Sequence, residues 1–240
     1  MKKAFPYTIF PLGDSALVLE FGDEIDLELN QHIQHIFKKI KQANLNYVTD
    51  AVPAYATLAV FYNLLEVPYD REKSSFETVA EKLRVIVENS ISVDIAKEKK
   101  LIEIPVCYSL KFGIDLTELA QKNKMNIEEL ITIHFSTVYH VFMIGFLPGF
   151  AYMGEVDASI ATPRRSTPRQ EVVAGSVGIA GKQTGIYPFS SPGGWNIIGR
   201  TPIQLFKKNA EPPMLLQQGD KIKFFSITED EYKNHKGRHI

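Results

Sequence analysis

Glycine and proline are concentrated in one part of this 240-residue chain, and their distribution constrains the fold more than any other feature. Ten of the fifteen glycines lie between Gly145 and Gly199, and six of the thirteen prolines lie between Pro148 and Pro202. Both residue types interrupt long helices and favour turns. From Thr137 onward, short β-rich runs are separated by turns at brief intervals, which predicts a sandwich or a barrel.

The front of the chain instead alternates strand and helix patterns. Asp26 can cap a helix whose apolar residues recur with a period near 3.6, and Ser74 with Glu77 has the spacing of a capping box for a second helix. The order strand, helix, strand, strand, helix predicts an α+β domain over residues 1–96. The predicted strands cover residues 17–21, 47–52 and 57–62.

A second domain is predicted over residues 97–240. The charged segment Lys97–Lys100 is expected to be a solvated connector between the two domains. A strand at 101–108 follows, and then two short helices that Asp115 and Asn126 are expected to cap.

Charge and cysteine usage exclude several classes of protein. The net charge of -1 leaves no excess of Lys and Arg for nucleic acid, and the only cysteine, Cys107, cannot form an internal disulfide, which fits a reducing cytoplasm. No secretory signal is visible. Residues 130–154 carry no Lys, Arg, Asp or Glu, but Pro148 and three glycines interrupt them, so they are expected to form buried core rather than to enter a membrane.

The histidines predict no metal site, because no cluster of Cys, His and carboxylate residues has a ligand-like spacing. His32 and His35 share one face of a predicted helix and are expected to be an exposed pair. The other four are predicted to be structural or to lie in a polar C-terminal tail: His134, His140, His235 and His239.

Three arginines lie close together between two prolines. Pro163 and Pro168 bracket most of a run that contains Arg164, Arg165 and Arg169. Because proline fixes φ, such a loop can hold guanidinium groups ready for a carboxylate or a phosphate. The alternative is a solvated basic loop without a ligand.

The glycine-rich run at residues 174–185 matches none of the common nucleotide or nucleophile motifs. A Walker A loop fails at two positions, a nucleophile elbow fails because Ala174 replaces its first glycine, and the dinucleotide fingerprint is absent. Two interpretations stay open: strands and turns of a tightly curved β structure, or backbone that lines a ligand pocket. The second would involve Gly149, Gly175, Gly178, Gly181 and Gly185.

The segment that follows holds the only tryptophan of the chain. Tyr187 and Trp195 can form the wall of a small-molecule site, or both can fill the core. In the first interpretation the polar contacts to the ligand come from Gln183, Thr184, Ser191 and Arg200.

Four long motifs occur in fixed order: FLPGFAYMG at 146–154, PRRSTPR at 163–169, AGSVGIAG at 174–181 and SPGGW at 191–195. Together they resemble one family, that of KipI, which is also described as the B subunit of the bacterial ATP-dependent 5-oxoprolinase and as allophanate hydrolase subunit 1. The resemblance extends over nearly the whole chain, although Glu155 and Val173 depart from the usual glycine and proline.

The resemblance implies an α+β N-terminal domain followed by a cyclophilin-like β-barrel C-terminal domain. It implies a cytoplasmic enzyme that opens the lactam of 5-oxoproline to L-glutamate beside partner subunits C and A, with ATP consumed by the assembled complex and no metal site in this chain. No catalytic residue is assigned, and the chain is expected to be inactive alone. Two alternatives come with the resemblance: a binding protein that inhibits a sensor histidine kinase, and a carboxyltransferase subunit of the urea carboxylase type.

Overall fold

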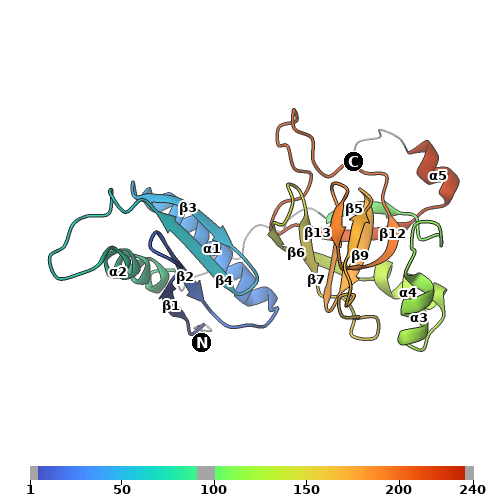
Figure 1. Cartoon of the computed structure of the whole chain (residues 1–240), viewed down its shortest axis with the longest axis horizontal. Coiled ribbons are helices and arrows are strands. Elements are labelled where there is room, and N and C mark those ends of the chain that lie inside the picture. Colours follow the sequence, from blue (N-terminus) through green and yellow to red (C-terminus); the bar gives the residue numbers. More distant parts are fainter. Residues whose placement is uncertain (1–4, 91–100, 236–240) are drawn as a thin grey trace. The chain divides into compact units, whose positions relative to one another are not determined.

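A computed structural model describes residues 5–90 and 101–235 of the chain (Figure 1). The chain divides into two compact units, Met1–Lys97 and Glu98–Ile240, which we call unit 1 and unit 2. The predicted connector Lys97–Lys100 lies outside the described residues. The predicted domain boundary at residue 97 therefore stays a prediction, and each unit is described by itself.

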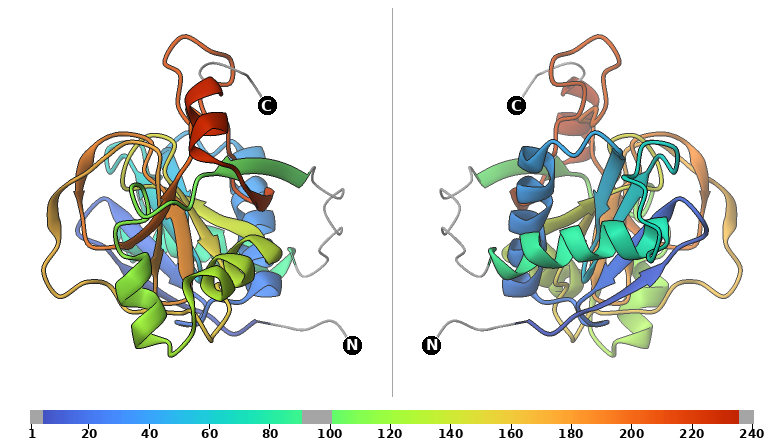
Figure 2. Two further views of the ribbon diagram at one scale, coloured as in Figure 1. Left: turned by 90° about the vertical axis from the view of Figure 1, so that its right-hand side faces the viewer. Right: turned by 90° about the vertical axis from the view of Figure 1, so that its left-hand side faces the viewer.

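Unit 1 consists of an antiparallel sheet with the strand order β1-β2-β4-β3 and two helices. Alternate residues of the strands and the apolar faces of the two helices form one core. The right-hand view of Figure 2 shows α2 running across the strands. The elements are β1 (Thr8–Pro11), β2 (Ala16–Glu20), α1 (Leu27–Ala43), β3 (Val48–Pro53), β4 (Thr57–Tyr62) and α2 (Ser75–Glu88).

Both helices of unit 1 begin where the sequence predicts. The N–H of Leu29 donates to Oδ1 of Asp26 over 2.6 Å at the start of α1. The N–H of Ser74 donates to the Glu77 carboxylate over 2.7 Å while Oγ of Ser74 accepts from the N–H of Glu77, which completes the capping box of α2. The three predicted strands are confirmed as β2, β3 and β4, whereas the short β1 was not predicted.

The prediction of an exposed histidine pair is wrong for His32. This side chain is buried, and its ring lies 5.9 Å from the ring of Phe21 in an edge-on contact. His32 follows Leu29 by three positions and precedes Ile36 by four, so it lies on the buried face of α1. Burial lowers the pKa of His32 below its ordinary value of 6.5.

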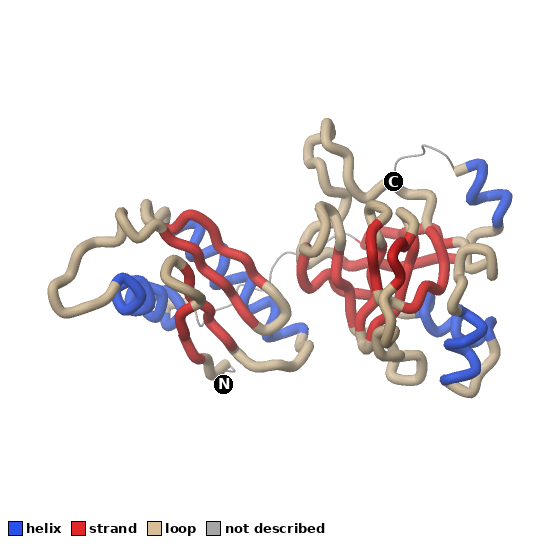
Figure 3. Tube along the Cα trace, in the orientation of Figure 1, coloured by secondary structure: helices blue, strands red, loops and turns tan. Residues whose placement is uncertain are grey.

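Unit 2 is built around a curled seven-stranded sheet with the strand order β12-β9-β10-β7-β6-β13-β5, in which only the β13–β5 pair is parallel. The two strands β8 and β11 form a separate small sheet. In Figure 3 the short strands of unit 2 are red and the many loops between them are tan. The strands are β5 (Leu101–Val106), β6 (Val138–Ile144), β7 (Ala151–Gly154), β8 (Arg169–Val172), β9 (Ser176–Ala180), β10 (Gln183–Ile186), β11 (Ser191–Gly193), β12 (Asn196–Arg200) and β13 (Lys221–Ser226).

The two edge strands of the seven-stranded sheet meet at one point. Cys107 directly follows β5, and it exchanges two backbone hydrogen bonds, of 2.8 and 3.0 Å, with Arg200 at the end of β12. The sheet therefore curls back on itself like a barrel. The likeness to cyclophilin itself stays a prediction.

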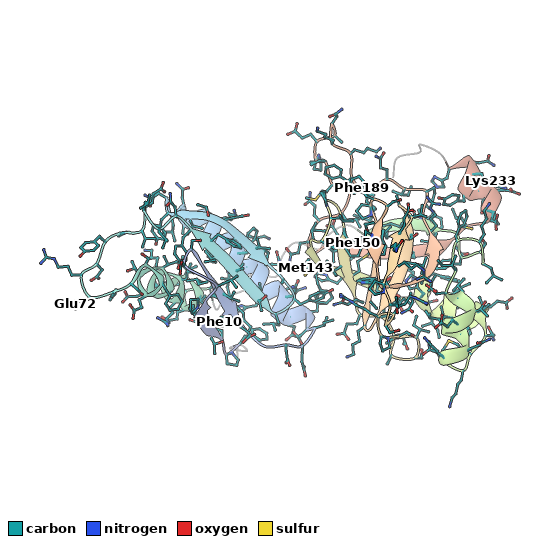
Figure 4. All side chains as sticks on the ribbon, in the orientation of Figure 1. Phe10, Glu72, Met143, Phe150, Phe189 and Lys233 are labelled. Atoms are coloured by element: carbon teal, nitrogen blue, oxygen red, sulfur yellow. The ribbon has the colours of Figure 1, made fainter. Side chains whose placement is uncertain are left out.

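The curled sheet separates a large core from a small one. The large core lies among the inward-facing strand residues and the helices α3 (Leu116–Lys122) and α4 (Ile127–Ser136). The small core is an aromatic cluster on the other face that contains Phe150, Tyr187 and Trp195. Phe150 is labelled among the strands of unit 2 in Figure 4. Because side chains alternate along a strand, Ile186 enters the large core while Gly185 faces the aromatic cluster.

The helices of unit 2 are α3 (Leu116–Lys122), α4 (Ile127–Ser136) and α5 (Glu229–Asn234). Asn126 caps α4 as predicted. Asp115 precedes α3 but makes no capping hydrogen bond, because its carboxylate binds other groups. The sequence predicts only short β-rich runs after Thr137 and so misses α5. This helix is six residues long and buries none of them, so it leaves no apolar period in the sequence.

In the described parts of the chain, no helix combines the length and the apolar character that a membrane crossing needs. The charge-free residues 130–154 form the end of α4, β6 and β7, and many of their side chains belong to the two cores.

Candidate functional site

The arginine loop, residues 163–169, is fixed on the start of β12. The N–H of Arg165 donates to the carbonyl oxygen of Gly194 over 2.8 Å. Nδ2 of Asn196 donates to the carbonyl oxygen of Pro163 over 2.8 Å. These bonds, together with the two prolines, give the loop a defined conformation, so its three guanidinium groups have defined surroundings.

A buried carboxylate holds two of the three arginines. Oδ1 of Asp115 accepts from Nη2 of Arg169 over 2.5 Å and from Nη1 of Arg165 over 3.1 Å, and the Asp115 side chain is 3% exposed. Its Oδ2 accepts from the N–H of Ile197 over 2.6 Å. Arg165 also binds the exposed carboxylate of Glu118 over 3.1 Å. These contacts fix Arg165 and Arg169 in place, and the contact of either residue with a ligand stays a prediction.

Arg164 differs from its two neighbours in the loop. It is exposed, and no ion-pair partner for it lies among the residues that the structure describes. Burial raises the pKa values of Tyr152 and Tyr187, and the positive charge of Arg164 partly offsets this rise. Because no carboxylate of the described residues holds it, Arg164 is the arginine of this loop that is available for an anion.

The predicted aromatic wall lies in the interior of unit 2. Tyr187 and Trp195 are buried, and both rings make edge-on contacts with Phe150, with centroid distances of 5.3 and 5.4 Å. A hydrogen bond from the backbone of Trp195 fixes Tyr187 further. The structure thus supports the core interpretation for both residues, and their contact with a ligand stays a prediction.

The predicted glycines lie in tightly packed β structure. A Cβ on Gly178 would lie 3.1 Å from Cβ of Trp195, and Gly149 and Gly175 have φ of +83° and +84°. Gly181 starts the turn between β9 and β10, and its N–H donates to the carbonyl oxygen of Thr162 over 2.7 Å. The N–H of Gly175 donates to the carbonyl oxygen of Tyr187 over 2.7 Å. Since these donors are used within the fold, an anion here depends on side chains, and a glycine-lined pocket stays a prediction.

The predicted polar contacts lie in three different places. Gln183 is partly exposed at the start of β10, Ser191 begins β11, and Thr184 is fully buried beside His134. The structure therefore does not bring these three residues together in one site with Arg200. Their role in binding a ligand stays a prediction.

Arg200 and Arg169 both line a pocket that the sequence did not predict. We call it the Phe112 pocket; it has a volume of about 100 Å³ and opens to solvent. Nε of Arg200 donates to the carbonyl oxygen of Ala174 over 2.8 Å. Residues that line the pocket include Lys111, Phe112, Arg169, Glu171, Ser176 and Arg200.

His134 is part of a buried hydrogen-bond chain. Its Nδ1 lies 2.8 Å from the Tyr108 hydroxyl, and its Nε2 lies 3.0 Å from Oγ1 of Thr184. Oγ1 of Thr184 donates its only proton to the carbonyl oxygen of Gly178, so it accepts from Nε2–H of His134. Nδ1 then accepts from Tyr108. Burial lowers the pKa of His134 to about 3, and the neutral ring has the structural role that the sequence predicted.

No group of three or more His, Cys, Asp or Glu residues that could hold a metal ion occurs within residues 5–90 and 101–235. The hydrogen-bond donors of the site are guanidinium, ammonium and hydroxyl groups, which bind an anion rather than a cation.

The family model "Carboxyltransferase domain, subdomain C and D" matches residues 7–216. Because this match extends over most of both units, the chain belongs to that family of carboxyltransferase domains.

Two curated relatives indicate a particular branch. The B subunit of the 5-oxoprolinase of Bacillus subtilis (strain 168) is 42% identical over 233 residues, which cover 96% of this chain and 97% of that protein. The B subunit of the 5-oxoprolinase of Escherichia coli O157:H7 is 35% identical over 224 residues, which cover 93% of this chain and 96% of that protein. The predicted resemblance is therefore confirmed.

The fold also occurs in a much larger protein. The crystal structure of the Kluyveromyces lactis urea amidolyase matches 97% of this chain and 16% of that chain, with a TM-score of 0.78 and 19% sequence identity. At this identity the match shows the fold alone.

Proposed function

We propose that this chain is the B subunit of a cytoplasmic, ATP-dependent 5-oxoprolinase, which opens the lactam of 5-oxoproline to L-glutamate together with partner subunits C and A. The observation that carries the proposal is the 42% identity over 96% of the chain to the B subunit of a 5-oxoprolinase. The positively charged arginine loop on the surface of unit 2 supports it, because both substrates of this reaction are anions.

The proposed reaction needs ATP because an amide carbonyl is a poor electrophile. Transfer of the γ-phosphoryl group to the lactam oxygen would make its carbon more reactive and release ADP. Addition of water and expulsion of the protonated ring nitrogen would give an acyl phosphate, and a second water would release phosphate and leave glutamate. Each step develops negative charge on oxygen, which positive side chains and N–H donors stabilise.

In this proposal the residues of the arginine loop have different tasks. Arg164 is exposed and contacts the substrate or the transferred phosphoryl group, while Asp115 holds Arg165 and Arg169 in place. Gln183, which is partly exposed at the start of β10, orients the substrate. The glycine-rich run forms strands and a turn, so ATP is bound by side chains at a site shared with a partner subunit or on that subunit.

The test is a reconstituted complex. Co-expression of this chain with its candidate partner subunits should give ATP-dependent release of glutamate from 5-oxoproline, and the chain alone should give none. In the complex, Arg164→Ala should lower kcat by about 100-fold or more, which is the usual effect of removing a group that stabilises a transition state.

Arg84→Ala is the matched control, since Arg84 is an exposed arginine of α2 in unit 1. It should leave turnover unchanged. Unchanged turnover in Arg164→Ala would remove this residue from the mechanism, and a complete complex that releases no glutamate would contradict the proposed function.

A second candidate is carboxyl transfer to urea, which the description of the family as carboxyltransferase domains favours. The same reconstituted complex should not carboxylate urea in the presence of a carboxybiotin donor. Carboxylation of urea without glutamate release would favour this candidate instead. Inhibition of a sensor histidine kinase stays a prediction from the resemblance.

A further inference from the structure

Three cationic side chains and one carboxylate line the Phe112 pocket: Lys111, Arg169 and Arg200 against Glu171. The chain has no Asp or Glu between Glu171 and Glu211, so β9 and β12 bring no carboxylate to this place. The lining is therefore positive, which favours an anion as its occupant.

Two of these cations lie against the same ring. Nζ of Lys111 is 5.6 Å and Cζ of Arg200 is 5.9 Å from the centroid of Phe112. The ring of Tyr232 packs on Phe112 with a centroid distance of 4.5 Å and restricts its movement. Each cation is attracted to the ring, and both line the same pocket, so an anion in the pocket would be attracted to both charges.

The two arginines are fixed in place but still have donors to offer. Nε of Arg200 binds the carbonyl oxygen of Ala174, and within the described residues no acceptor binds its two Nη groups. Nη2 of Arg169 binds Asp115, while Nη1 of Arg169 is buried without an acceptor in the same part of the chain. Guanidinium groups held in this way lose little freedom when they bind a carboxylate or a phosphate.

We propose that the Phe112 pocket binds the oxyanion group of a small molecule, a carboxylate or a phosphate, between Lys111, Arg169 and Arg200. The volume of about 100 Å³ suits such a group with a few attached atoms rather than a whole nucleotide. The proposal rests on the proposed function only for its first probe, 5-oxoproline, which carries one carboxylate.

The experiment is an NMR titration of the full chain in which the side-chain Nε–H groups of arginine are observed. Sodium L-5-oxoproline, inorganic phosphate and the uncharged methyl ester of 5-oxoproline are added in separate titrations. Saturable shifts at Arg169 and Arg200 with 5-oxoproline identify a carboxylate, and shifts with phosphate alone identify a phosphate. The ester should cause neither. No saturable shift with either anion would overturn the proposal.

Two variants and one control place the anion in the pocket. Arg200→Gln should weaken binding by about tenfold or more, as expected for the loss of a charge-assisted hydrogen bond. Lys111→Gln should weaken it by about two- to fivefold, because Lys111 is exposed. Lys208→Gln, at an exposed lysine outside the pocket, should leave the affinity within twofold.

Lys111→Gln keeps the proposal testable if Arg200→Gln fails to fold, since the Lys111 side chain donates no hydrogen bond to the described residues. Equal affinity in wild type and Lys111→Gln would overturn it. Binding at the pocket by a chain whose complex releases no glutamate would contradict the proposed function and support the inference. Glutamate release by a complex in which this chain binds neither anion would support the proposed function and contradict the inference about the pocket.

Discussion

A single buried residue, His134, connects the segment that follows β5 with β10 through the neutral form of its ring. It accepts from Tyr108 at Nδ1 and donates to Thr184 from Nε2, and its ring stacks on Phe224 with a centroid distance of 4.9 Å. A protonated ring could not accept from Tyr108 and would place a charge in the core. The neutral form with Nε2–H is therefore part of the folded structure.

This arrangement predicts how stability depends on pH. The pKa of His134 is about 3 in the folded chain and about 6.5 in an unfolded one. Between these values the unfolded chain binds a proton that the folded chain does not, so the contribution of His134 is fully present above about pH 6.5 and decreases as the pH falls. From pH 6.5 to 4.5 this group should lower the free energy of unfolding by about 2–3 kcal/mol.

The test is urea denaturation of wild type and His134→Gln across this pH range, with the fluorescence of Trp195 as the signal. It measures how the free energy of unfolding of each protein depends on pH. The variant should be less stable at pH 7 but should lack this part of the pH dependence. Histidine ¹⁵N NMR should show a neutral ring protonated at Nε2 down to pH 4.5. The same pH dependence in both proteins would contradict the assignment.

Asp115 shows where prediction from the sequence reached its limit. The sequence identifies the arginine loop and places Asp115 before a helix, but its partners Arg165 and Arg169 lie 50 and 54 residues away, and Ile197 lies 82 residues away. No local sequence pattern predicts contacts between residues that are so far apart in the chain. Lys111 and Phe112 were missed for the same reason, because Arg200 joins them only after the sheet has curled.

At the scale of elements, the β9–β10 hairpin uses two glycines for different reasons. Gly181 starts the turn with φ of +59°, and no atom of the described residues lies within 4 Å of the position of its missing Cβ. Gly185 is in the strand, where a Cβ would lie 3.0 Å from the carbonyl oxygen of Ala151 and 3.1 Å from the ring of Trp195. The first position needs backbone freedom, and the second needs space.

Alanine at the two positions should therefore have different effects. Gly181→Ala should lower the free energy of unfolding by about 1–2 kcal/mol through backbone strain and leave the fluorescence spectrum of folded Trp195 unchanged. Gly185→Ala should lower it by about 1–3 kcal/mol through overpacking and shift that spectrum. As a control, Gly181→Asn should recover part of the loss, because Asn tolerates the left-handed conformation. An unshifted spectrum in Gly185→Ala would argue against the packing seen here.

The elements themselves were predictable where their signals are local. The caps at Asp26, Ser74 and Asn126 act over three residues, and all three helices start where these residues predict. The β-rich character of the second half follows from its turns. The curl of the sheet does not, since it depends on the meeting of Cys107 and Arg200.

At the scale of the whole molecule, each apolar core of the described residues is formed by residues of one unit only. One core is formed between Leu17 and Val87, and the other two are formed between Ile104 and Phe224. A fragment of residues 5–90 should therefore fold alone, with a free energy of unfolding of about 4–10 kcal/mol. Urea denaturation should be cooperative, and amide resonances should be dispersed. A broad, non-cooperative transition would show that this unit depends on the rest of the chain.

The position of β13 between β6 and β5 has a consequence during synthesis. The strand β5 begins at Leu101 and its neighbour β13 begins at Lys221, 120 residues later (221 − 101). At about 5–20 residues per second, the ribosome needs about 6–24 s to make that stretch. Throughout this time Ile104 and Val106, which end up fully buried, have no strand to pair with, so the nascent chain is a natural client for chaperones.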